Sequence, residues 1–175
     1  MKGILFNCVA DAVIEMGGDD LWDEVLQDAG LVGAYTSLGS YADGELVALT
    51  YAAAARLDVP ADQAMEWVGS AVVSKLVQRH LQLVENYDCT FDLLCALNSV
   101  IHPEVLKLYP EAVVPEFNVL HRNGDTLSLR YRSARNLVGL ATGLIRGASA
   151  LYGEELEITV DKEDQGCVFH LRLAR

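Results

Sequence analysis

The spacing of apolar residues changes once along this chain, and the change limits the folds that the chain can adopt. From residue 3 to about residue 100, apolar side chains recur three and four residues apart, as in helices with one buried face. From residue 117 onward, two pairs of short alternating segments flank one further helical stretch. Helices followed by hairpins predict an α+β fold, in which an N-terminal helical part packs on a C-terminal antiparallel sheet with a long helix.

Five helices are predicted in the first part of the chain. They cover residues 3–16, 21–29, 45–57, 60–84 and 90–100. Gly17-Gly18 should end the first helix, because glycine is the residue most often found just past a helix end. The fourth helix contains a polar stretch near residues 77–80, where a break is expected.

Two hairpins and one long helix are predicted in the second part of the chain. The alternating segments are residues 117–121, 126–132, 156–160 and 167–173. Asn123-Gly124 separates the first two and is a strong signal for a tight hairpin turn. Helical spacing returns over residues 135–152 and stops at Gly153. The hairpins therefore predict one antiparallel sheet, with the long helix between them in sequence.

Length and composition indicate a single domain that spans residues 1–175. Apolar residues make up 51% of the chain, which is enough to build a buried core. No stretch approaches the roughly 20 apolar residues that a membrane span needs, and the start lacks a secretory cleavage site, so we expect a cytoplasmic protein. The net charge of −12, from 13 basic and 25 acidic residues, argues against nucleic acid and anionic membranes as partners.

Three polar residues after the first hairpin form a candidate site for a carboxylate. Tyr131, Ser133 and Arg135 alternate with other residues, so an extended strand would place their side chains on one face. That face would present two hydroxyls and a guanidinium, whose fixed donors suit carboxylates. A histidine elsewhere that reaches a metal would complete a site for a ligand with a metal centre and a carboxylate edge. Haem is such a ligand.

The same residues resemble the signature of a known family. Tyr131-x-Ser133-x-Arg135, together with His102, Tyr109-Pro110 and Pro115, is similar to the haem nitric oxide/oxygen-binding (H-NOX) family. Further matches are Met1–Asn7, Trp22, Tyr35–Ser37, Gly143-Leu144 and Gly147. The resemblance covers essentially the whole chain and is that of a bacterial stand-alone member. It implies the H-NOX fold and a haem-based gas sensor.

The resemblance implies that His102 is the axial ligand of a haem iron. Of the four histidines, it alone has the family's spacing to Tyr109-Pro110. His80 and His121 lie in polar surroundings and are expected to face solvent. Pro103 restricts the residue before it away from helical conformations. We therefore expect His102 at the junction of two helices, with Pro103 at the first position of the second.

The implied cofactor is haem b (iron protoporphyrin IX), held through its propionates as well as its iron. By the resemblance, Arg135 pairs with a propionate, and Tyr131 and Ser133 add hydroxyl donors. Charge-assisted hydrogen bonds of this type contribute roughly 1.5–3 kcal/mol each. Pro115 is implied to lie against the porphyrin, where the family's proline bends the ring away from planarity.

The side of the haem opposite His102 selects the gas, because a hydrogen-bond donor stabilises bound O₂ whereas NO binds strongly without one. In oxygen-binding family members a tyrosine lies three residues before the glycine of the long helix, and here that residue is Leu140. The supporting polar positions correspond to Val9 and Val72, and Leu5 and Leu144 complete an apolar wall. We therefore predict that NO and CO bind and that O₂ forms no stable complex.

The leading hypothesis for function is a haem-based NO sensor. NO would weaken the bond between iron and His102, and the change would pass to a partner protein, which in the family is a histidine kinase or a cyclic-di-GMP enzyme. The alternative is a non-haem module on the same fold that binds a small carboxylate ligand against Arg135. An enzyme is not expected, because the chain has no nucleophile motif, phosphate-binding loop or metalloprotease helix.

Overall fold

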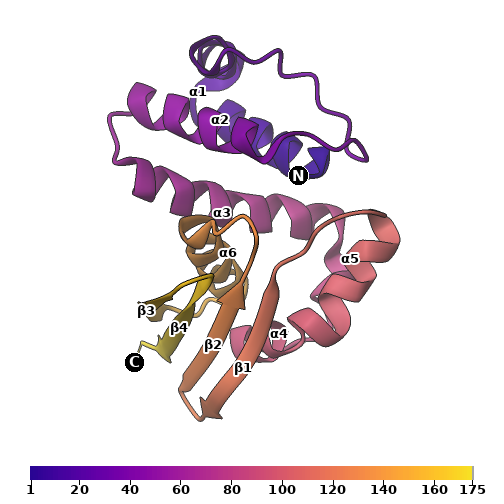
Figure 1. Cartoon of the computed structure of the whole chain (residues 1–175), viewed down its shortest axis with the longest axis vertical. Helices are drawn as coiled ribbons and strands as arrows, with labels where there is room; N and C mark the ends of the chain where they lie inside the picture. Colours follow the sequence, from indigo (N-terminus) through magenta and orange to yellow (C-terminus); the bar gives the residue numbers. More distant parts are fainter. Residues whose placement is uncertain (175) are drawn as a thin grey trace.

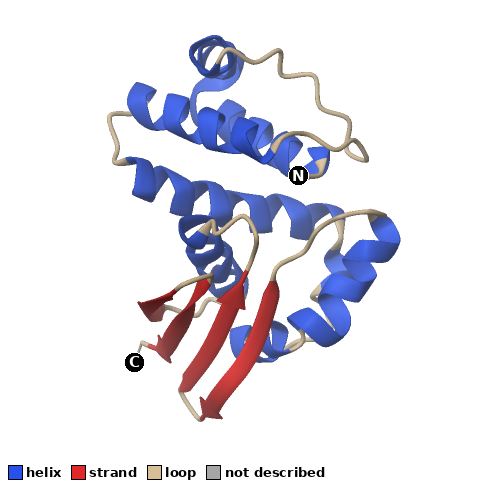
Figure 2. Ribbon diagram, viewed as in Figure 1, coloured by secondary structure: helices blue, strands red, loops and turns tan. Residues whose placement is uncertain are grey.

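The computed structural model describes residues 1–174 and combines α-helices with a four-stranded antiparallel sheet (Figures 1 and 2). The helices are α1 (Gly3–Ala29), α2 (Asp43–Arg56), α3 (Ala61–Arg79), α4 (Thr90–Cys95), α5 (His102–Leu108) and α6 (Val138–Leu151). A 3₁₀ turn, η1 (Leu81–Leu83), and a π-helical turn, η2 (Leu97–Ile101), connect some of them. The strands are β1 (Glu116–Asn123), β2 (Thr126–Arg132), β3 (Leu156–Glu163) and β4 (Gly166–Leu173). The predicted α+β fold is confirmed.

The helices break close to the positions that the sequence predicts. α1 continues past residue 16, but Gly18 has φ 80° and ψ −180°, so the helix kinks there. α3 stops at Arg79, in agreement with the expected break near residues 77–80. The predicted helix over residues 90–100 is instead divided into α4 and the π turn η2. In η2 the N–H of Ile101 bonds to the carbonyl of Ala96, five residues back rather than four.

The sheet has the strand order β1-β2-β4-β3, and every neighbouring pair is antiparallel. Both predicted hairpins are present, and Phe117 of β1 lies opposite Tyr131 of β2. The register of this hairpin shifts between Val119 and His121, which is a β-bulge. β1 is an edge strand, so one side of its backbone has no strand partner.

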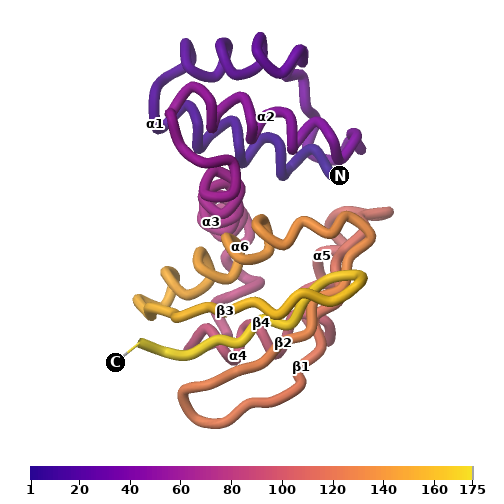
Figure 3. Tube along the Cα trace, turned by 60° about the vertical axis from the view of Figure 1, so that its left-hand side comes forward, coloured from indigo at the N-terminus to yellow at the C-terminus, as the bar shows by residue number. Residues whose placement is uncertain are grey.

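α3 lies between the other N-terminal helices and the part of the molecule that contains the sheet (Figures 1 and 3). α6 packs directly on α3, and glycines permit the close approach of their backbones. A Cβ atom on Gly143 of α6 would lie 1.9 Å from the carbonyl oxygen of Glu66, and one on Gly69 of α3 would lie 2.3 Å from that of Leu140. Any side chain at either position would force the two helices apart.

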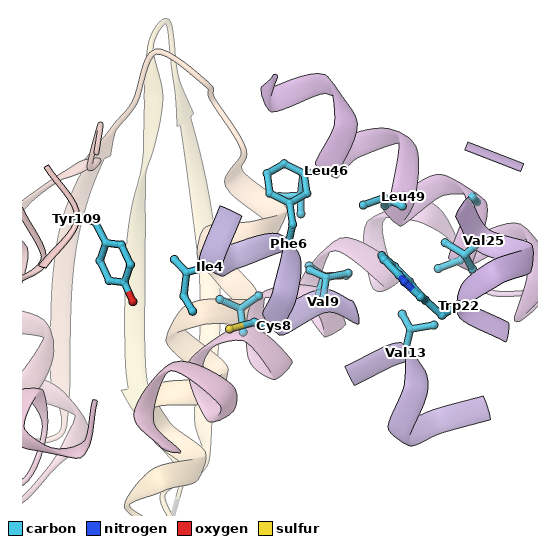
Figure 4. Close-up of a cluster of buried hydrophobic side chains, with 14 residues drawn as sticks. Ile4, Phe6, Cys8, Val9, Val13, Trp22, Val25, Leu46, Leu49 and Tyr109 are labelled. Carbon is cyan, nitrogen blue, oxygen red and sulfur yellow. The ribbon is translucent and has the colours of Figure 1, made fainter. Parts of the chain in front are cut away.

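Buried apolar side chains form two clusters, one on each side of α3 and α6. The helical cluster gathers residues of α1, α2 and α3 together with Tyr109 (Figure 4). The sheet cluster gathers residues of α4, α6 and the four strands. Among residues 1–174, no helix has both the length and the apolar character needed to cross a bilayer. The elements that carry the predicted site residues lie around the border between the two clusters.

Candidate functional site

His102 is the first residue of α5 and directly follows the π turn η2. Pro103 stands in the first turn of α5, where a backbone N–H would have no partner within the helix, so proline is tolerated. The expected position of His102 at a helix junction agrees with this arrangement, although the backbone of His102 itself is helical, with φ −64° and ψ −40°. Burial lowers the pKa of His102, which favours a neutral imidazole. A neutral ring has a free nitrogen lone pair and can bind a metal.

Asn98 of the π turn attaches the segment before His102 to the sheet. Its side-chain Nδ2 donates to the carbonyl of Phe117 at 2.7 Å, and the N–H of Phe117 donates to its Oδ1 at 3.0 Å. The Phe117 ring lies 6.3 Å from the His102 ring and 5.2 Å from the Tyr131 ring, between centroids. Sequence reasoning missed Asn98, because its partner is a backbone group 19 residues away and leaves no pattern.

Tyr131, Ser133 and Arg135 lie at the end of β2 and in the turn that follows it. The strand ends at Arg132, so only Tyr131 belongs to it, and Asn136 in the left-handed region (φ 47°) delays the start of α6 to Val138. Tyr131 is buried, while Ser133 and Arg135 are half-buried. Burial raises the pKa of Tyr131, and hydrogen bonding to Ser133 offsets this only in part. The Tyr131 hydroxyl is therefore protonated at neutral pH and can donate.

Arg135 is held by groups from distant parts of the chain. Its Nη1 donates to the carbonyl of Val113 at 2.7 Å, and its Nε lies 2.8 Å from Oδ2 of Asp43. The other Asp43 oxygen lies 2.9 Å from the N-terminal amine of Met1. Although burial works in the opposite direction, the Arg135 guanidinium and this ammonium hold the pKa of Asp43 below its usual range. Asp43 thus occupies the carboxylate-binding side of Arg135.

The Nε of Arg135 is buried and has Asp43 as its ion-pair partner, but it makes no hydrogen bond of good geometry. A buried N–H without a well-formed hydrogen bond is unfavourable, and a second carboxylate could accept it. The neutral His102 and this Arg135 donor therefore fit a ligand with both a metal centre and a carboxylate, as the sequence analysis expects of haem.

The five residues predicted to form the apolar wall come from three helices and all belong to the helical cluster or pack against it. Val9 of α1 and Val72 of α3 are each 2% exposed and belong to the helical cluster. Leu5 of α1 and Leu140 and Leu144 of α6 are partly buried against the same cluster. All five side chains are hydrocarbons, so none of them can donate a hydrogen bond.

Pro115, His80 and His121 are the remaining residues whose surroundings were predicted from the sequence. Pro115 is half-buried in the irregular segment just before β1, two residues from Phe117. His80 was expected to face solvent, and this is wrong: it is half-buried at the end of α3, and its Nε2 lies 2.7 Å from the hydroxyl of Tyr109. Polar neighbours in the sequence suggested exposure, but the end of α5 covers this ring. His121 is exposed, as expected.

Comparison with known families and structures extends over the whole chain. The family model described as Haem-NO-binding matches residues 2–160. No curated protein sequence matches. A crystal structure of an H-NOX protein from Shewanella oneidensis in the Fe(II)NO ligation state is 31% identical, with 100% of each chain covered and a TM-score of 0.91.

Two more solved structures are similar over almost their full length. An NMR structure of an H-NOX domain from Shewanella oneidensis in the Fe(II)CO ligation state is 31% identical, with a TM-score of 0.89 and coverage of 100% of this chain and 99% of that one. A crystal structure of the Fe(II) unliganded H-NOX protein from K. algicida is 28% identical, with a TM-score of 0.86 and coverage of 100% and 97%.

Proposed function

The chain belongs to the haem-NO-binding (H-NOX) family, and from this membership we propose that residues 1–175 form a single sensor domain that binds haem b and responds to NO. The observation that carries the proposal is the presence of both a half-buried His102, whose lowered pKa favours a neutral ring, and a buried Arg135 guanidinium whose Nε pairs with Asp43 without a well-formed hydrogen bond. The ligation states of the solved relatives, with Fe(II), do not favour the alternative of a non-haem carboxylate module.

Haem, when bound, would supply a ferrous iron that can bind a small gas. His102 would hold this iron through a ring nitrogen on the α5 side. Arg135 would pair with a propionate, while the Tyr131 and Ser133 hydroxyls donate to the same group. Pro115 would lie against the porphyrin. Since Asp43 already lies 2.8 Å from Arg135 Nε, a propionate would have to share or displace it.

Gas selection would follow from the wall opposite His102. The side chains of Leu5, Val9, Val72, Leu140 and Leu144 offer no hydrogen-bond donor. This wall gives bound O₂ no stabilisation, whereas NO and CO do not depend on one. The domain would therefore bind NO and CO and exclude O₂. It would act as a sensor and not as an enzyme, because these residues include no group that could act as an acid or base at the gas.

His102 would transmit the effect of gas binding to the rest of the protein. His102 would join the iron of a bound haem to α5, and NO at that iron would weaken this link, so that α5 would no longer be restrained through His102. Such a change is a signal only if a partner binds the two arrangements with different affinity. A histidine kinase or a cyclic-di-GMP enzyme is the proposed class of partner.

An anaerobic optical spectrum of the reduced protein tests the proposal. It is recorded before and after addition of NO, and a separate sample is measured before and after addition of air. We expect a haem Soret band, a shift with NO, and no long-lived complex with air. His102→Gly should lose the haem unless imidazole is supplied, while His121→Gly, which removes an exposed histidine, should keep it. A colourless protein that takes up no added hemin would refute the proposal, and a long-lived adduct with air would refute the exclusion of O₂.

A further inference from the structure

Helix α5, which carries His102, is weakly held along its length. None of the seven residues described for this helix is buried, and Leu106 and Leu108 are each 40% exposed. Among the described residues its one ion pair, between Glu104 and Lys107, lies within the helix and does not attach it to another element. Val105 packs only partly against the helical cluster. Whatever holds α5 in place must therefore act mainly at its two ends.

The first anchor lies before the helix, at Asn98. The π turn that contains Asn98 continues directly into His102. The Asn98 amide satisfies both the N–H and the carbonyl of Phe117, on the side of edge strand β1 that has no strand partner. Phe117 is 7% exposed and belongs to the sheet cluster. This anchor therefore joins the start of α5 to the sheet.

The second anchor lies after the helix, at Tyr109. This residue directly follows Leu108, is 9% exposed, and its ring belongs to the helical cluster (Figure 4). Its hydroxyl lies 2.7 Å from Nε2 of His80, the residue that ends α3. The backbone N–H of His80 in turn bonds to the last turn of α3, at Leu76 and Val77. This anchor joins the end of α5 to the helical part of the molecule.

We infer that Asn98 and Tyr109 are positioning residues that hold the two ends of α5, so that His102 releases its iron when NO binds instead of moving with it. This inference rests on the proposed function. A loosely held helix could shift by a fraction of an ångström, and His102 would then follow the iron toward the gas. A helix tied at both ends resists that shift, and the resistance adds to the weakening of the bond that NO causes. The polar anchors would thus convert gas binding into loss of the His102 bond.

The size of the effect follows from the number of hydrogen bonds removed. Tyr109→Phe removes one hydrogen bond and preserves the ring, so we expect the ratio of retained to released His102 in the NO-loaded protein to rise about fivefold. Asn98→Ala removes two hydrogen bonds, and we expect a rise of about twentyfold. Asn98→Asp keeps the shape and the acceptor for the Phe117 N–H but places a second acceptor against the Phe117 carbonyl, so its ratio should also rise above that of the wild type.

The experiment measures this ratio in haem-loaded protein under anaerobic conditions, from the Soret position and the electron paramagnetic resonance hyperfine pattern after NO addition. Two matched controls should match the wild type. Lys107→Ala removes the ion pair within α5, and Asn118→Ala removes an amide on β1 that bonds only to the side chain of Glu116. Folded Tyr109→Phe and Asn98→Asp variants with the wild-type ratio would overturn the inference.

Hydrogen exchange of the haem-free protein gives a second readout that does not depend on gas. Amides of residues 97–108 should exchange faster in the two anchor variants, while amides of β2 and α6 should be unchanged. A uniform change across the chain would indicate general destabilisation and would count against a positioning role.

The failure of the inference and the failure of the proposed function give different results. A wild-type protein that takes up no haem would refute both. A wild-type protein that binds haem and NO, and releases His102 to the same extent with and without the anchors, would refute only the inference. A wild-type protein that keeps His102 bound in the presence of NO would also refute the inference and leave haem binding in place.

Discussion

The two sides of the proposed haem site are built in different ways. On the gas side, Val9 of α1 and Val72 of α3 are fully buried, Leu5, Leu140 and Leu144 are partly buried against the same cluster, and Gly69 and Gly143 bring the backbones of α3 and α6 into contact. On the opposite side, α5 buries none of its described residues and is held by hydrogen bonds at its ends. Close packing on the gas side resists displacement, because any shift creates overlaps or cavities at once. A helix without buried side chains lacks this source of resistance and depends on the hydrogen bonds at its ends.

This contrast suggests that the two sides of the proposed site have different functions, one in selecting the gas and the other in transmitting the response. A rigid, apolar wall keeps a constant shape and so can distinguish gases by the donors that it lacks. A helix held mainly by a few hydrogen bonds at its ends loses its position when those bonds are removed, whereas a closely packed helix does not depend on so few contacts. The proposed iron ligand, His102, stands on the side that is held mainly at two points, and the residues proposed to select the gas stand on the closely packed side. Three substitutions test whether the two sides differ as the structure implies.

The largest effect is expected from Gly143→Ala on the gas side. The new Cβ would lie 1.9 Å from the carbonyl oxygen of Glu66, so α3 and α6 must separate, and we expect a loss of about 3 kcal/mol in the free energy of unfolding. Urea denaturation measures this loss. The matched control is Gly139→Ala on the same helix, whose Cβ would meet only the flexible Met65 side chain at 3.2 Å. Equal stability of the two variants would contradict a rigid contact between α3 and α6.

A smaller effect is expected from Leu140→Tyr. This substitution leaves α5 unchanged and adds a hydrogen-bond donor to the gas side. One neutral hydrogen bond contributes about 1 kcal/mol, so the affinity of the reduced haem protein for O₂ should rise about fivefold. Optical titration with O₂ measures the change. Leu140→Phe introduces a ring of nearly the same size as tyrosine but without the hydroxyl, so it should not raise the affinity for O₂. If both variants behave alike, the wall does not select the gas through hydrogen bonding.

The smallest effect is expected from Leu108→Ala on α5. Because Leu108 is 40% exposed, its truncation should lower the free energy of unfolding of the haem-free protein by only about 0.5 kcal/mol. Leu46→Ala in the helical cluster, where the side chain is 1% exposed, serves as the comparison and should lower it by about 3 kcal/mol. A loss at Leu108 similar to that at Leu46 would show that α5 is as firmly packed as the helical cluster.

Much of the fold was predictable because it depends on local signals. Asn123-Gly124 and the alternating segments around it predicted the first hairpin, and Gly18 breaks α1 where the glycine pair indicated. The division of residues 90–101 into α4 and a π turn was not predictable, because a π turn has no spacing of its own in a stretch this short. For the site, the family resemblance supplied His102 and Arg135, and their roles toward haem stay predictions.

The contacts that position these residues escaped sequence reasoning altogether. Asn98 bonds to the backbone of Phe117, Tyr109 bonds to a histidine that was expected to face solvent, and Asp43 lies against Arg135. In each case the partners come from different elements, and nothing in the spacing of either residue indicates the other. Polar pairs of this kind form only after apolar packing has brought the elements together.

The sequence by itself determined which segments are helices and strands, the family, and the chemical identity of the residues that could hold iron and carboxylates. These properties follow from local periodicity and from residue type, and folding alters neither of them. Only the tertiary structure decided how firmly each of these residues is held. Packing density and hydrogen bonds between distant segments depend on three-dimensional distances, so the rigidity of the gas side and the looseness of α5 appear only in the folded chain.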